Sequence, residues 1–248
     1  MEYPNRIITT GEKDAAVVKQ IQTRLNQMGY GLSFIDGIFD QTTIKAVKAY
    51  QQNHLDQNGN PLITDGEVGP RTWMCLFYNF LPKEMPSSPL LIELLKIARK
   101  EIGVQEDPPY SNRGARVEEY LKSVNLVPGN PWCAAFVYWC FQQASISLNR
   151  ANPLPRTGSC MNHWYITKGE KLTSLTAFLN PDDIKPGDVF IINRQGGKGH
   201  TGIVTGVCNG YIYTIEGNSN AFHSAEGYEV IELQRRIDSI SAGFIRYK

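Results

Sequence analysis

One cysteine in the 248-residue sequence stands where a nucleophile could form. Cys133 follows the turn-forming residues Gly129, Asn130 and Pro131, and it opens an almost unbroken apolar run that continues to Phe141. Turn residues before such a run predict a buried helix that begins at or just before Cys133. A thiol in the first helical turn lies beside unpaired backbone N–H groups and the positive end of the helix dipole, and both favour the thiolate. The same N–H groups can hold the oxyanion that forms when a thiolate attacks an amide carbonyl.

The other four cysteines are predicted to be small buried hydrophobic residues. Cys140 lies nearly on the same helical face as Cys133 but two turns further inside the helix, where the field of the helix end is absent. The odd number of cysteines, their wide spacing and the lack of a C-x-x-C pair argue against a disulfide scaffold or a structural zinc site. The four are Cys75, Cys140, Cys160 and Cys208.

A cysteine nucleophile needs a general base and a group that orients this base. His200 is the best placed of the four histidines, because a glycine-rich loop at 196–199 delivers it to the start of a predicted strand at 201–207. His163 and His223 lie in polar stretches, where surface or structural roles are expected. We therefore predict that His200 is the base.

Two polar residues follow the next predicted strand, 211–215. Side chains alternate along a strand, so Glu216 and Asn218 point to the same face if the strand persists. Either can accept a hydrogen bond from one imidazole nitrogen and fix the tautomer whose other nitrogen faces the thiol. Glu216 would also stabilise the imidazolium. For the pair alone, the alternative is a solvated glutamate and a turn asparagine at a strand end.

The elements that must position these residues fall into two modules. Prolines at 82, 86 and 89 can neither continue a helix nor join a central strand, which predicts a linker at 83–89. The predicted domains are therefore 1–82 and 90–248. In the second domain, apolar periodicity predicts helices at 90–102 and around 117–121, followed by the helix at Cys133, and strands at 189–192, 201–207 and 211–215.

The first module contains an internal repeat. Asp36, Gly37 and Thr43 recur 29 residues later as Asp65, Gly66 and Thr72, and each copy leads from a turn into a helix. Together with an apolar stripe at 17–28, this pattern predicts a small domain of three helices. The segment from about 10 to 80 resembles the peptidoglycan-binding domain type 1, a three-helix cell-wall module. The resemblance rests on Leu25, Gly29, Tyr30, Asp36, Gly37, Phe39, Thr43, Ala46, Val47, Tyr50, Gln51, Asp65, Gly66, Val68, Gly69, Pro70, Thr72 and Trp73.

The second module, from about 95 to 247, resembles the CHAP domain, a papain-like amidase and peptidase family that acts on peptidoglycan. Four pieces carry the likeness, in the family order Cys, His, Glu, Asn: 131–137, 185–188, 199–204 and 215–218. The resemblance implies an α+β fold whose antiparallel sheet packs against helices. It also implies that Cys133 is the nucleophile, His200 the base and then the acid, Glu216 the orienting partner and Asn218 a helper.

The chain departs from the family pattern in two places. Some members bind calcium through aspartates just before the cysteine, whereas 124–132 has no carboxylate, so we predict no metal there and no cofactor. Many members also place Gln before the cysteine, where this chain has Trp132. Trp132 is predicted to line the substrate cleft, with packing in the core as the alternative.

The predicted function is hydrolysis of a peptidoglycan amide by a Cys-His-Glu mechanism, tethered to the wall by the first domain. The bond is either the N-acetylmuramoyl-L-alanine amide or a peptide bond of the stem or cross-link. The alternatives are a wall-binding protein without catalysis and a cysteine hydrolase that acts on another amide.

The remaining expectations concern partners and location. The 25 basic and 24 acidic side chains nearly cancel, so nucleic acid is not an expected partner. No apolar run is long enough for a membrane span, and the first ten residues do not look like a signal peptide. We expect a monomer that is made in the cytoplasm and acts at the bacterial cell wall, in the periplasm or outside the cell, after release or delivery. Its partners would be peptidoglycan and an immunity or delivery protein.

Overall fold

The computed structural model describes residues 3–54, 56, 61–77, 86, 88–208, 210–220 and 227–248. The chain divides into two compact units, Met1–Leu81 and Pro82–Lys248. His223 and most of the predicted linker lie outside the described residues. Pro89, which was placed in that linker, is instead the first residue of a helix, because its fixed φ suits the first helical position. Within the described ranges, no helix is long and apolar enough to cross a membrane.

The described part of the first unit contains three helices, as predicted: α1 (Ala15–Gln27), α2 (Gln41–Gln52) and α3 (Pro70–Phe77). Each helix turns one apolar stripe inward, and the stripes meet in a small core. Its fully buried members include Val18, Ile21, Leu25, Val47, Tyr50, Trp73 and Leu76. A side chain of Asp14 caps the start of α1, which fixes where this helix begins.

The internal repeat is built around a glutamine. The Gln22 side chain donates to Asp36 Oδ1 at 3.0 Å and to Thr43 Oγ1 at 3.1 Å, and it accepts from the Gly37 N–H at 2.9 Å. Gln51, 29 residues later, makes the corresponding three bonds at 2.8, 3.2 and 2.9 Å. The partners of Gln51 are Asp65, Thr72 and Gly66. Each copy therefore joins a helix to the turn that precedes the next helix.

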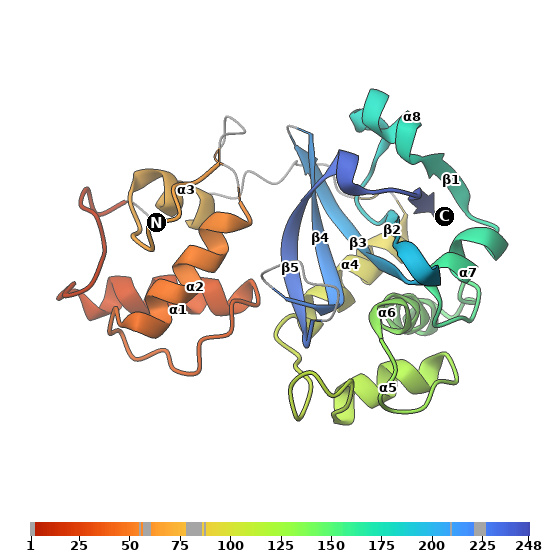
Figure 1. The fold of residues 1–248 in the computed structure, drawn as a ribbon, viewed down its shortest axis with the longest axis horizontal. Coiled ribbons are helices and arrows are strands. Elements are labelled where there is room, and N and C mark those ends of the chain that lie inside the picture. Colours follow the sequence, from red (N-terminus) through yellow and green to blue (C-terminus); the bar gives the residue numbers. More distant parts are fainter. Residues whose placement is uncertain are drawn as a thin grey trace. The chain divides into compact units, whose positions relative to one another are not determined.

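The second unit combines five helices with one six-stranded sheet among its described residues, which confirms the predicted α+β class (Figure 1). Neighbouring strands are antiparallel, in the order β1-β6-β2-β3-β4-β5. The helices are α4 (Pro89–Glu101), α5 (Ala115–Ser123), α6 (Cys133–Ser147), α7 (Cys160–Ile166) and α8 (Ser174–Leu179). The strands are β1 (Glu170–Thr173), β2 (Val189–Asn193), β3 (Gly199–Cys208), β4 (Tyr211–Ser219), β5 (Glu229–Arg236) and β6 (Gly243–Arg246).

Helices α4, α5 and α6 share the larger core with one face of the sheet. Strand residues that pack into this core are Val189, Ile191, Ile203, Ile215, Val230 and Ile245. Helix α6 is apolar on all sides from Cys133 to Phe141, and 11 of its 15 residues are buried, so packing fixes its position. A smaller core on the other face includes Phe190, Val204, Ile212 and Phe244. The packing of α6 on the sheet determines where Cys133 lies.

Candidate active site

Cys133 is the first residue of α6, as the sequence predicts. Trp132 is the N-cap residue, and its side chain makes no capping bond to the helix, so the first-turn N–H groups are not capped by it. The Phe136 N–H closes the first turn on the Trp132 carbonyl at 2.8 Å. The thiol is buried, with 5% of the residue exposed.

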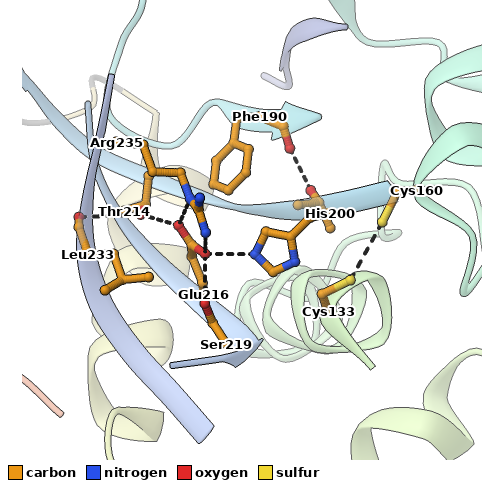
Figure 2. A network of polar contacts seen from close by, with 10 residues as sticks. Cys133, Cys160, Phe190, His200, Thr214, Glu216, Ser219, Leu233 and Arg235 are labelled. Atoms are coloured by element: carbon orange, nitrogen blue, oxygen red, sulfur yellow. Dashed lines mark hydrogen bonds and ion pairs between the residues drawn. The ribbon is translucent and has the colours of Figure 1, made fainter. Parts of the chain in front are cut away.

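His200, in β3, lies between Cys133 and Glu216 (Figure 2). Its Nε2 is 2.7 Å from Glu216 Oε2, which fixes the ring and leaves Nδ1 for the thiol side. Glu216 lies in β4, the neighbour of β3 in the sheet. The structure therefore brings Cys133, His200 and Glu216 together in a row, through one helix start and two adjacent strands.

Arg235 of β5 is a member of this network that the sequence analysis missed. Its Nε lies 2.5 Å from Glu216 Oε1 and its Nη2 lies 2.6 Å from Glu216 Oε2. The guanidinium therefore donates two hydrogen bonds to the carboxylate (Figure 2). The hydroxyls of Thr214 and Ser219 also donate to Glu216, at 2.6 and 3.1 Å. Glu216 is fully buried, and these bonds compensate for its lost hydration.

The pKa values in the row favour a thiolate and an imidazolium. The Cys160 thiol, the His200 ring and the Ala134 N–H together hold the pKa of Cys133 well below its usual value, although burial opposes this. Burial disfavours the charged ring, but Cys133 and Glu216 outweigh it and raise the pKa of His200. Burial also opposes ionisation of Glu216, yet Arg235 and then His200 hold its pKa well below normal. These directions favour an ion pair between the Cys133 thiolate and the His200 imidazolium.

Cys160 is buried in the core, as predicted, but it also contacts the candidate nucleophile, which was not predicted. Its sulfur lies 3.6 Å from the sulfur of Cys133 (Figure 2). The interaction with Cys133, followed by burial, raises the pKa of Cys160 well above the usual value, so the proton stays on Cys160. Cys140 is fully buried in the core, and burial raises the pKa of its thiol well above normal. The side chain of Cys208 is not among the described groups, and Cys75 is half-buried.

Asn218 does not share the position of Glu216. The pairing of β4 with β5 shifts between Glu216 and Ser219, and Asn218 has a left-handed φ of 54°, so the simple alternation of the strand fails there. Asn218 is buried, and its Oδ1 makes no hydrogen bond to any described residue. The imidazole is thus held by Glu216, while the role of Asn218 stays a prediction.

Trp132 does not line a cleft, which corrects that expectation. Its side chain is fully buried, and its indole nitrogen donates to Glu106 Oε1 at 2.8 Å. A Cβ on Gly217 would lie 2.6 Å from Trp132 Cζ3 and 2.7 Å from Phe136 Cβ. The absence of a side chain at Gly217 therefore lets β4 approach the start of α6. Trp132 packs in the core between these two elements.

His163 is buried as well, which gives it a structural role. Its Nε2 lies 2.6 Å from the Tyr247 hydroxyl, and burial lowers the pKa of His163 to about 4. Among the described residues, no group of three or more His, Cys, Asp or Glu side chains is arranged to hold a metal ion. The absence of a calcium site remains a prediction from the missing carboxylates at 124–132.

Two family models match the chain. Residues 14–76 match the model of a putative peptidoglycan binding domain, and residues 125–218 match the CHAP domain. The second segment contains all four predicted catalytic positions and Cys160. A CHAP domain with a peptidoglycan-binding domain indicates a peptidoglycan hydrolase, of amidase or peptidase type, that acts at the cell wall. Both resemblances are therefore confirmed, and the chain carries a peptidoglycan-binding domain followed by a CHAP domain.

Proposed function

We propose that this protein hydrolyses an amide bond of peptidoglycan with Cys133 as the nucleophile, His200 as the base and then the acid, and Glu216 as the orienting carboxylate. The observation that carries the proposal is the buried row of these three side chains at the start of α6, with the Glu216–His200 bond of 2.7 Å. A helix start supplies backbone donors for an oxyanion, and the ion pair supplies the thiolate.

In the acylation step, the Cys133 thiolate attacks the amide carbonyl and forms a tetrahedral intermediate. Unpaired N–H groups in the first turn of α6 receive its oxyanion. The His200 imidazolium then gives its proton to the leaving amine, and the C–N bond breaks to leave a thioester. Glu216 keeps the ring oriented throughout, because it holds Nε2 while Nδ1 exchanges the proton.

In the deacylation step, His200 is neutral and takes a proton from water, whose oxygen attacks the thioester. The C–S bond breaks, the acid product leaves, and Cys133 returns as a thiolate beside the imidazolium. Asn218 is proposed as a helper because it follows Glu216 by two residues in β4 and its buried Oδ1 has no hydrogen-bond partner among the described residues.

The first unit is proposed to hold the polymer while the second cuts it. Attachment at one point makes later encounters with the same polymer effectively intramolecular, which raises the local substrate concentration without any new contact at the active site. Loops around the active site set the choice between the N-acetylmuramoyl-L-alanine amide and a peptide bond of the stem or cross-link, so both remain within the proposal.

The direct test is lysis of purified sacculi by the full chain. We expect Cys133→Ser and His200→Ala to abolish lysis while both variants still sediment with sacculi. Cys140→Ala, which removes the other thiol of α6, should keep the activity. Lysis by the Cys133→Ser protein would reject the nucleophile assignment. Mass spectrometry of the released fragments identifies the bond that is cut.

Two measurements separate the rival functions. If the second unit were catalytically dead, an alkylating reagent at about pH 6 would not react selectively with Cys133, since an ordinary thiol is protonated there. If the substrate were another amide, the Cys133→Ser chain would fail to sediment with sacculi.

A further inference from the structure

Two thiols from different helices meet inside the proposed active site. Cys133 and Cys160 are the first residues of α6 and α7, 27 positions apart in the sequence, and their sulfurs are 3.6 Å apart. Each residue is 5% exposed, and the proposed mechanism uses only Cys133 as the nucleophile. Cys160 packs in the core and lowers the pKa of Cys133, and its sulfur is also close enough to react with that of Cys133.

The backbone beside His200 makes room for the second thiol. A Cβ on Gly199, the residue before His200, would lie 2.8 Å from Cys160 Cβ and 3.6 Å from Cys160 Sγ. Any side chain at position 199 would therefore push Cys160 away from β3. The close packing of Cys160 on this strand is what keeps its sulfur beside the nucleophile.

We propose that Cys160 is a resolving cysteine, which forms a reversible disulfide with Cys133 when a peroxide oxidises the enzyme. The effect on activity rests on the proposed function, because the disulfide removes the thiolate that would attack the substrate. The formation of the bond itself does not depend on that function.

The chemistry balances in two steps. The Cys133 thiolate attacks one oxygen of hydrogen peroxide, the O–O bond breaks, and proton uptake leaves a sulfenic acid on Cys133 and one water. The Cys160 sulfur then attacks the Cys133 sulfur, the S–O bond breaks, and the hydroxide leaves as water with the proton of Cys160. A thiol reductant reverses the reaction by exchange and is itself oxidised to a disulfide.

The division of roles follows from where the proton lies. Cys133 carries the lowered pKa and is the better target for peroxide, while Cys160 keeps its proton until the sulfenic acid forms. The sulfurs must move about 1.5 Å closer to reach the bonded separation of about 2.05 Å. The proposal therefore requires rotation of the two side chains and a small shift of α7, a helix of 7 residues.

The test uses the full chain, reduced and then treated with hydrogen peroxide after removal of the reductant. We expect an intact mass lower by two hydrogen atoms, a cross-linked peptide pair containing Cys133 and Cys160, and loss of sacculus lysis. Dithiothreitol should restore both the mass and the lysis. Cys140→Ala should behave in the same way, since the cross-link does not involve that thiol.

The Cys160→Ser variant provides the contrast. Without a resolving thiol, Cys133 should pass on to the sulfinic acid, which dithiothreitol does not reduce, so the loss of lysis becomes permanent. Cys160→Ala serves as a second variant and should show the same mass change if Cys160→Ser folds poorly.

Three outcomes overturn the proposal: oxidised wild type that gains oxygen without a cross-link, a disulfide that joins another pair, or variants of Cys160 that recover lysis as fully as wild type. A chain that forms the cross-link but never lyses sacculi would reject the proposed function and leave the disulfide intact. The two ideas therefore fail in distinguishable ways.

Discussion

Replacing Arg235 by methionine should destabilise the second unit strongly and inactivate it, although Arg235 is not expected to touch the substrate. Arg235 is 8% exposed at its side chain and Glu216 is 0% exposed, and two bonds of 2.5 and 2.6 Å join them. Methionine fills much of the same volume but leaves the carboxylate without a counter-charge. The perturbation therefore isolates the electrostatic part of the contact.

Removal of one partner from a buried ion pair costs about 3–5 kcal/mol, because the remaining charge is neither hydrated nor paired. Thr214, Ser219 and His200 continue to bond to Glu216 in the variant, so we expect a loss near the lower limit, about 3 kcal/mol at about pH 7. Without Arg235 the pKa of Glu216 rises, and at pH values below this raised pKa the Glu216 carboxyl is neutral. The difference in stability between wild type and variant should accordingly shrink as the pH falls toward the ordinary carboxyl range.

The assay is denaturant unfolding followed by tryptophan fluorescence, with the change in free energy taken from the midpoint and slope. Arg236→Met is the matched control, since Arg236 is the next residue of β5 and its ion pair with Asp238 lies at the surface. That variant should leave the unfolding midpoint nearly unchanged. Sacculus lysis of both variants is measured in parallel.

A double variant makes the reasoning refutable. Glu216→Gln combined with Arg235→Met removes both charges, so it should be more stable than Arg235→Met alone by at least about 1 kcal/mol. A loss of less than about 1 kcal/mol in the single variant would falsify the argument, since it would mean that the carboxylate is hydrated or already neutral. A double variant less stable than the single one would show that packing, and not charge, dominates.

Three further predictions follow from the same region. The lowered pKa of Cys133 and the raised pKa of His200 widen the pH range in which both groups are charged, so lysis should be near its maximum at about pH 7. A rate of lysis that rises only near the ordinary thiol pKa of about 8.5 would contradict this. The pKa of His163 is about 4 in the folded state, against about 6.5 in the unfolded chain. The neutral ring therefore contributes fully to the free energy of unfolding above about pH 6.5. Up to about 3 kcal/mol of this contribution is lost as the pH falls toward 4. Unfolding midpoints across this range should fall less steeply for His163→Gln, and equal slopes would reject the assignment. Gly217→Ala places a Cβ 2.6 Å from Trp132 Cζ3, so it should cost about 1–3 kcal/mol and reduce lysis, whereas an unchanged midpoint and rate would show that β4 can move away freely.

The start of α6 was predictable from the sequence because its causes are local. Turn residues, then an apolar run, determine where the helix begins, and the dipole argument needs nothing more than this position. His200 and Glu216 were predictable for a similar reason, since His200 comes between a glycine-rich loop and the start of one apolar strand and Glu216 directly follows the next strand. Their mutual bond then follows from the pairing of β3 with β4, which are neighbours in the sequence.

Arg235 was not predictable because its role depends on pairing between strands. The second half of β5 contains Glu232, Gln234, Arg235 and Arg236, a composition typical of a solvated strand. The Arg235 guanidinium is buried only because β5 pairs with β4, which brings Arg235 to Glu216, 19 residues away in the sequence. Cys160 was missed for the same kind of reason, since nothing near it in the sequence indicates a second thiol or the strand at Gly199.

Asn218 and Trp132 show the limits of extending a local rule. Alternation along a strand places Asn218 with Glu216, but the register shift and the left-handed backbone at Asn218 break that rule at the last residues of β4. Trp132 stands beside the nucleophile in sequence, yet its indole is buried in the core, where it packs against the backbone at Gly217. Sequence proximity to a reactive residue does not determine which way a side chain faces.

The contact between the sulfurs of Cys133 and Cys160 has two effects, one on the charge of the nucleophile and one on its oxidation. Arg235 holds the pKa of Glu216 low, and Glu216 and Cys133 both raise the pKa of His200. Cys160 adds a hydrogen-bond donor to the thiolate and so favours the reactive form. The same 3.6 Å contact places a resolving thiol next to the most oxidisable atom in the site, so stabilisation of the nucleophile and its sensitivity to peroxide have a common structural origin.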